Sequence, residues 1–79
     1  MFKLSVLDIN TALPVFKEMV SVVVLPGEEG ELTILNFHQT MISCLKEGLL
    51  RIDNNPPMMI KGGIAKMKDD ELVVLVEKE

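Results

Sequence analysis

Turn-forming residues recur along this chain at short intervals, and that spacing limits the chain to short extended segments. The turn signals are Pro26-Gly27, Gly30, Gly48, the run from Asp53 to Pro57, Gly62-Gly63 and Asp69-Asp70. They leave segments of about six residues, which is the usual length of a β-strand. Short segments at such regular spacing are typical of an all-β sandwich or barrel.

The apolar spacing inside these segments also favours strands. Phe2 to Asp8 alternates with a period of two, which suits a half-buried strand. Val20 to Leu25 and Leu72 to Val76 are β-branched runs that suit strands buried on both faces or nearly so. We therefore predict about eight or nine strands, at residues 2–9, 14–18, 20–25, 31–36, 41–46, 49–53, 57–61, 63–68 and 71–76.

The segment from His38 to Gly48 fits a helix as well as a strand. Met41, Ile42, Leu45 and Leu49 would share one helical face, and Gly48 would suit the C-terminal cap. The neighbouring segments favour a strand, because a lone helix would need its own sheet face to pack on in a chain of 79 residues. With no repeat, low-complexity run or interior linker, we expect one domain.

Charge and composition argue against several kinds of partner. The chain carries 8 Lys and Arg against 12 Asp and Glu, a net charge of -4 that does not suit phosphate backbones. It has no Trp or Tyr and only 3 Phe, so it also lacks the aromatic side chains on which single-stranded bases stack. No apolar run approaches the roughly 18 residues of a membrane span. We expect no nucleic-acid binding and no direct membrane insertion.

Cys44 is the only cysteine, so it has no internal disulfide partner, and we expect an interior compartment for the chain. We interpret Cys44 as a small buried apolar residue. A catalytic pair with His38 would span roughly 20 Å along an extended strand, which is too far for a thiol and an imidazole. One His and one Cys are also too few for a metal. We predict no catalytic residue, no metal site and no cofactor.

Three smaller features have a structural and a functional interpretation each. Glu28-Glu29-Gly30-Glu31 is either a solvated loop or an acidic recognition loop for a basic partner; its adjacent carboxylates splay apart and do not suit acid–base catalysis. Gly62-Gly63 starts no phosphate-binding loop, so we expect tight backbone contact or positive φ there. The 6 Met residues suit core filling first and a pliable contact patch second.

Several features occur in a characteristic order. A first strand like Phe2 to Ile9 precedes Val24 to Leu35 with its Pro-Gly-x-x-Gly loop, and His38, Leu45 to Ile52 and Lys61-Gly62-Gly63-Ile64-Ala65 follow. In this order they resemble the epsilon subunit of F-type (rotary) ATP synthases, from about residue 2 to residue 76. The resemblance implies a flattened β-sandwich, here of about eight to ten short strands, and makes residues 41–46 a strand.

The resemblance also implies a function. It implies a non-catalytic central-stalk (rotor) subunit, which couples ion-driven rotation of the c-ring to the gamma shaft in ATP synthesis and has no cofactor or substrate of its own. It implies contacts with the polar loops of the c-ring at Glu29, Gly30 and Glu31. The implied contacts with the gamma subunit are at Asn10, His38 and Ser43. The implied location is peripheral, on the cytoplasmic side of the bacterial inner membrane, or on an organellar membrane.

The chain departs from the family pattern at identifiable positions. Thr33 stands where Gly is usual, Asn36 where Pro is usual, and Phe37 where a small residue is usual, while Gln39-Thr40 replaces an Ala-Pro or Thr-Pro pair. The rim beside gamma is therefore altered.

The two C-terminal helices of the family are also missing from residues 1–79, which predicts no inhibition of ATP hydrolysis by insertion into the catalytic head. The alternative to a rotor subunit is a free-standing β-sandwich interaction module whose edge strand captures peptides.

Overall fold

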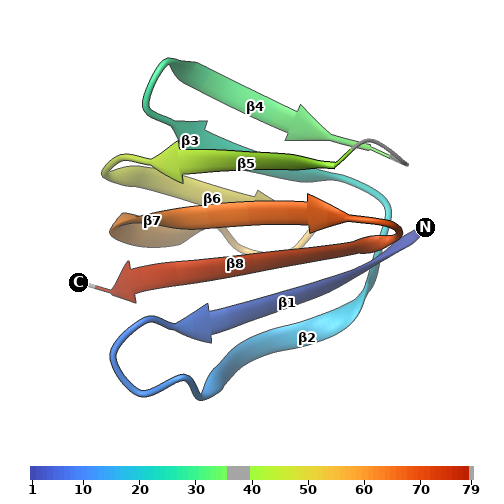
Figure 1. Cartoon of the computed structure of the whole chain (residues 1–79), viewed down its shortest axis with the longest axis horizontal. Coiled ribbons are helices and arrows are strands. Elements are labelled where there is room, and N and C mark those ends of the chain that lie inside the picture. The colour runs from blue at the N-terminus through green and yellow to red at the C-terminus, as the bar shows by residue number, and fades with distance from the viewer. Residues whose placement is uncertain (36–39, 79) are drawn as a thin grey trace.

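The computed structural model describes residues 1–35 and 40–78, and within them every regular element is a β-strand (Figure 1). The all-β prediction is therefore confirmed. The strands are β1 (Phe2–Asp8), β2 (Pro14–Val20), β3 (Val23–Gly27), β4 (Gly30–Ile34), β5 (Met41–Leu45), β6 (Gly48–Ile52), β7 (Met58–Lys68) and β8 (Glu71–Lys78).

The strands form a sheet that folds over on itself into a sandwich. Their order is β2-β1-β8-β7-β5-β3-β4, and β6 lies off this path and pairs with both β3 and β7. β7 belongs to both layers, since Gly48 of β6 pairs with Ile60 while Leu45 of β5 pairs with Gly63. In Figure 1, β3 and β6 lie behind the layer that contains β7 and β8. β1 and β8, both interior strands of this order, pair in parallel.

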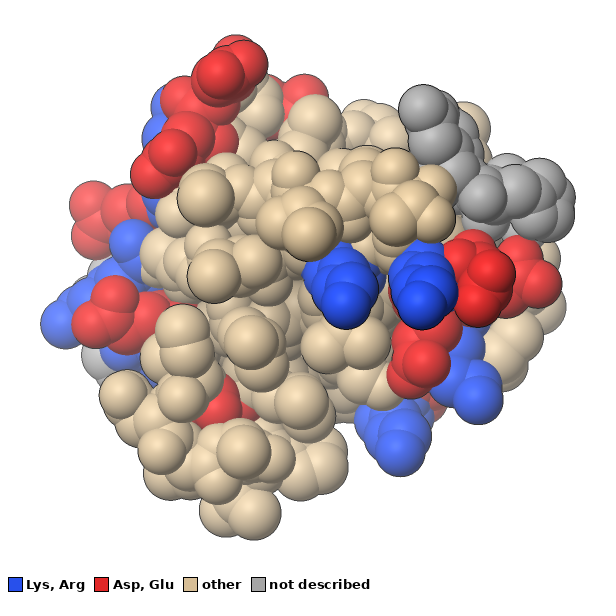
Figure 2. All heavy atoms as spheres, viewed as in Figure 1, with Lys and Arg blue, Asp and Glu red and all other residues tan. Residues whose placement is uncertain are grey.

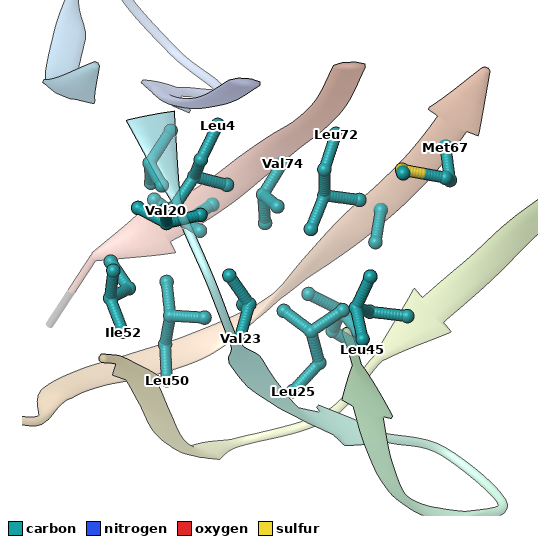
Figure 3. Close-up of a cluster of buried hydrophobic side chains, with 14 of the residues drawn as sticks. Leu4, Val20, Val23, Leu25, Leu45, Leu50, Ile52, Met67, Leu72 and Val74 are labelled. Atoms are coloured by element: carbon teal, nitrogen blue, oxygen red, sulfur yellow. The ribbon is translucent and has the colours of Figure 1, made fainter. Parts of the chain in front are cut away.

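The core between the layers is aliphatic, as a chain with few aromatic residues requires (Figure 3). Alternate residues point into it, and the resulting burial with a period of two is clearest in β6 and β8. In β8 the inward residues are Leu72, Val74 and Val76, all with no exposed surface. Among the methionines only Met67 is fully buried, while Met41 and Met58 pack against the core from its edge. Core filling is therefore confirmed for part of this set.

The predicted strand at residues 20–25 is wrong, because the chain changes layers inside it. Val20 ends β2 and Val23 begins β3. Between them, the backbone N–H groups of Ser21 and Val22 donate to Oδ1 of Asp53, at 3.0 and 2.9 Å. A carboxylate distant in sequence thus fixes a crossing point that the β-branched run does not reveal.

The two strands predicted at residues 57–61 and 63–68 form one strand, β7, with an irregularity between Ile60 and Gly62 in its pairing with β8. Gly63 there has a φ of 156°, and a Cβ at this position would collide with the carbonyl oxygen of Leu75. Only glycine fits such a close approach of two strands. The expectation of tight contact at Gly62-Gly63 is confirmed.

Residues 41–45 form strand β5, which confirms the strand interpretation over the helix for these residues. The beginning of that segment, including His38, lies outside the described residues, as does the end of the strand predicted at 31–36. The buried assignment of Cys44 is wrong, since the side chain is exposed. The reason is the alternation along β5, in which Leu45 points into the core and its neighbour therefore points out.

Candidate functional site

The acidic loop is the tip of the β3–β4 hairpin. Gly27 pairs with Gly30, and a Cβ on Gly27 would lie only 2.6 Å from the carbonyl oxygen of Gly30. Gly30 itself has a φ of 135°, which glycine adopts without strain. The two glycines therefore allow a tight turn, and the carboxylates of Glu28, Glu29 and Glu31 are all exposed on it.

The hairpin is fixed to β5 by backbone hydrogen bonds. The N–H of Glu28 donates to the carbonyl oxygen of Cys44 at 3.0 Å, and the N–H of Lys46 donates to that of Pro26 at 2.8 Å. These bonds hold the acidic tip against the end of β5. The loop therefore has a defined position relative to the sandwich, although its side chains are solvated.

An open groove of about 490 Å³ lies between this hairpin and β5. Its walls are residues 27–32 on one side and Ile42, Ser43 and Cys44 on the other. The first wall is acidic. The second is mostly apolar, and half-buried Ser43 contributes a hydroxyl group to it. Such a groove can accept an extended basic side chain, with its methylene groups on Ile42 and its charge near the carboxylates.

The predicted site residues are thus only partly brought together. Glu29, Gly30 and Glu31, the predicted c-ring contacts, share the groove with Ser43, a predicted gamma contact. Asn10 lies in the exposed connection from β1 to β2, where its N–H donates to Oδ1 of Asp8 at 2.8 Å. Figure 1 shows this connection at the same end of the molecule as the β3–β4 hairpin, with β8, β7 and β5 between them. His38 lies outside the described residues.

A second surface escaped the sequence reasoning. Cys44 pairs with Ile64, and Leu75 pairs with both Ile64 and Leu7. Because directly paired residues project from the same face of a sheet, these four side chains form one apolar row across β5, β7, β8 and β1. We call the outer surface of these four strands the front face; it faces the viewer in Figure 2. The β-branched composition of β8 was the available signal, since it suits burial on both faces.

Two features are absent from residues 1–35 and 40–78. There, His, Cys, Asp and Glu side chains nowhere gather in a group of three or more that could bind a metal ion. Nor does this part of the chain contain a helix with the length and apolarity needed to cross a membrane. What the groove and the front face offer chemically is binding, through charge and apolar contact.

The chain is similar in sequence to known proteins. A family model described as "ATP synthase, Delta/Epsilon chain, beta-sandwich domain" matches residues 2–78. An ATP synthase epsilon chain of Campylobacter curvus is 40% identical over 67 residues, which are 80% of this chain and 52% of the relative. That of Desulforamulus reducens is 37% identical over 81 aligned positions, covering 98% of this chain and 61% of the relative. A chloroplastic epsilon chain of Pylaiella littoralis is 46% identical over 57 residues, 68% of this chain and 43% of the relative.

Two solved structures share the fold. In the central stalk and c-ring of the Tetrahymena thermophila mitochondrial ATP synthase, one chain matches 95% of this chain with a TM-score of 0.79 and 16% identity, over 62% of its own length. In the Euglena gracilis mitochondrial ATP synthase, the TM-score is 0.75 at 18% identity, with 96% of this chain and 51% of that chain covered.

The chain spans about half the length of the curated relatives that it matches. The family model covers the described sandwich from its first strand to its last. The chain belongs to the family of ATP synthase delta/epsilon chains, and residues 2–78 are its beta-sandwich domain.

Proposed function

We propose that this domain belongs to a non-catalytic central-stalk (rotor) subunit of an F-type ATP synthase, which couples ion-driven rotation of the c-ring to the gamma shaft in ATP synthesis. Membership of the delta/epsilon family supports the proposal. The structural observation that carries it is the acidic hairpin, held against one end of the closely packed sandwich. A packed sheet core is stiff, which suits a part that transmits torque.

The tip residues Glu29, Gly30 and Glu31 contact polar loops of the c-ring in this proposal. Their exposure supports it, as does the adjoining groove, which has room for a Lys or Arg side chain. One exposed ion pair contributes at most about 1 kcal/mol, so several weak contacts must act together. Apolar contact with Ile42, which is 70% exposed in the groove wall, supplies part of the remainder.

Asn10, His38 and Ser43 contact the gamma subunit in the same proposal. Ser43 and Asn10 are accessible at the groove and in the β1–β2 connection, respectively, which supports their assignment. Of the departures from the family pattern, Thr33 projects from β4 as an exposed residue, so a side chain is accommodated there. The other altered positions, apart from exposed Thr40, lie outside the described residues.

The proposed location is peripheral, on the cytoplasmic side of a bacterial inner membrane, with an organellar membrane as the alternative. The matched relatives come from bacteria and from chloroplasts, which supports an ATP synthase in one of these membranes. Residues 1–79 would reach the membrane through the c-ring and would need no cofactor or substrate for this role.

A charge reversal tests the c-ring contact. Glu31→Lys should weaken binding to a purified gamma and c-ring assembly several-fold, and Glu29→Lys/Glu31→Lys should weaken it further. Glu18→Lys is the matched control, since Glu18 and Glu31 are exposed carboxylates on β2 and β4, the two edge strands. Thermal unfolding followed by circular dichroism should be unchanged in all three variants.

Unaltered binding of the double variant would contradict the c-ring assignment. A pull-down with the wild-type chain that returns no rotor subunit, but a soluble partner, would instead favour a free-standing interaction module. In that case β2 and β4 would be the strands to examine, because each has an open edge in the described sheet.

A further inference from the structure

Most of one edge of β5 is unpaired. β3 follows β5 in the sheet order, but the two strands pair only at Gly27 and Leu45. Away from that point β3 pairs with β6, which lies in the other layer, so β3 and β5 diverge. Within residues 1–35 and 40–78, the beginning of β5 therefore pairs with β7 alone. In Figure 1 the tip of the β3–β4 hairpin lies beside the end of β5.

Two residues present backbone groups to this edge. The carbonyl oxygen of Cys44 accepts from the N–H of Glu28, so the backbone groups of Cys44 point away from β7. Because these groups alternate in direction along a strand, the N–H and carbonyl oxygen of Ile42 point the same way. No residue of the described chain accepts a hydrogen bond from the N–H of Ile42 or Cys44. An added strand could use these groups.

The groove beside the hairpin borders this edge and has an acidic wall. Its volume is about 490 Å³, and β5 forms one side of it. The other side includes half-buried Leu32, which packs against the core, together with Glu28, Glu29 and Glu31. No Lys or Arg of the described part of the chain lines the groove. Figure 2 shows carboxylates gathered at the upper left, where the hairpin tip lies in Figure 1. The groove is therefore complementary in charge to a basic segment.

We propose that the open edge of β5 binds an extended segment of another protein as an added strand. A Lys or Arg residue of that segment lies beside the acidic hairpin, and an apolar residue lies over Leu32. The N–H of Cys44 and both backbone groups of Ile42 fix its register, which solvated carboxylates alone do not. A second copy of the chain is a poorer occupant, because its edge strands β2 and β4 both carry exposed carboxylates. The inference goes beyond the proposed function and does not depend on it.

A synthetic nine-residue peptide of alternating valine and lysine, with blocked ends, tests the inference. The peptide is basic and its valines favour an extended conformation. Added to isotope-labelled chain, it should slow amide hydrogen exchange at Ile42 and Cys44 at least about tenfold, measured by nuclear magnetic resonance. Exchange at Ser43 should change less than about twofold, because its N–H already faces β7. The same peptide with glutamate in place of lysine should bind at least about tenfold more weakly.

Two variants of residue 42 separate the backbone contribution from that of the side chain. Ile42→Pro removes the N–H at the open edge and no hydrogen bond to β7. Ile42→Ala is the control, since it shortens the side chain and keeps the N–H. Ile42→Pro should bind the valine–lysine peptide about fivefold more weakly than Ile42→Ala does. Glu29→Gln/Glu31→Gln should weaken binding about fivefold at about 50 mM salt, and less at about 300 mM.

The outcomes decide the inference without involving the proposed function, because no rotor subunit is present in the assay. Unaltered exchange at Ile42 and Cys44 under excess peptide overturns the inference, as do equal affinities of the two residue-42 variants. Equal binding of the glutamate peptide overturns it as well, because the acidic wall would then play no part. A dimer in sedimentation equilibrium whose Ile42 and Cys44 amides are protected without peptide would identify a second copy as the occupant and overturn the proposal. Circular dichroism melts establish that each variant is folded; if Ile42→Pro is not, the exchange pattern of the wild-type chain decides.

Discussion

Replacement of Gly63 by alanine should destabilise this domain more than replacement of any other glycine on the same sheet. Two costs combine at this position. The φ of 156° is unfavourable for alanine, which costs about 1–3 kcal/mol. The new methyl group would also collide with the carbonyl oxygen of Leu75, and relief of that contact requires a shift of β7 or β8 at about 1–3 kcal/mol. The expected total is about 2–6 kcal/mol.

That loss is a large share of the available stability, since a domain of 79 residues has about 4–12 kcal/mol in all. Urea unfolding followed by far-ultraviolet circular dichroism is the suitable assay, because the chain has no Trp or Tyr for intrinsic fluorescence. Gly30→Ala is the matched control. Its φ of 135° is also unfavourable, but a Cβ there meets nothing within 4 Å, so only the backbone cost of about 1–3 kcal/mol remains.

The difference between these two variants therefore measures the collision alone. Gly63→Ala should lower the free energy of unfolding by at least about 1 kcal/mol more than Gly30→Ala does. Equal losses in the two variants would refute the close approach of β7 and β8 at Leu75. A soluble but unfolded Gly63→Ala chain would agree with the upper part of the expected range.

Two further predictions follow from hydrogen bonding and exposure. Asp53→Ala should lower the free energy of unfolding in urea by about 1–2 kcal/mol, because it removes the acceptor for the N–H groups of Ser21 and Val22. Asp53→Asn keeps an acceptor oxygen and tolerates the φ of 45°, so it should lower the free energy of unfolding by less than half as much. Equal losses in the two variants would show that the side-chain oxygen of residue 53 does not hold Ser21 and Val22 in place. The thiol of Cys44 is exposed, so it should react with N-ethylmaleimide in the native chain at a rate within about tenfold of that in the urea-unfolded chain. Mass spectrometry measures both rates. Protection of Cys44 by a hundredfold or more would contradict its outward direction on β5.

The fold class could be predicted because it depends on local signals. Asp69-Asp70 occurs where the chain reverses, and Pro26-Gly27 ends β3 just before a reversal. The strand predicted at residues 2–9 corresponds to β1, which ends one residue earlier, at Asp8. The strand interpretation of residues 41–45 over the helix required agreement with neighbouring segments. That agreement is a tertiary property, because the pairing partner of β5 in this region is the distant strand β7.

The errors have tertiary causes as well. The break between Val20 and Val23 depends on Asp53, which accepts hydrogen bonds from the N–H groups of Ser21 and Val22. These donors lie 32 and 31 residues before it in the sequence. No local pattern contains that information. The outward direction of Cys44 follows from the register of β5 on β7, and one residue of slip would reverse it.

The candidate site was predicted in part. The acidic hairpin was recognisable from its glycines and glutamates, but its contact with the wall formed by Ser43 and Cys44 follows only from the pairing of β3 with β5. The front face was missed because its residues lie on separate strands. Its apolar row is contiguous only in the folded sheet.

The parallel pairing of β1 with β8 constrains how the chain is made. β1 leaves the ribosome before the other strands of this sheet, yet one of its two neighbours in the sheet consists of residues 71–78. The core around Leu4 and Val6 therefore cannot close until Leu72 and Val74 have been synthesised and paired with them. Contacts of such long sequence separation make folding slow relative to that of local structures. The core around β1 can therefore close only after β8 has been synthesised, and without β8 a pair of β1 and β2 has two open edges.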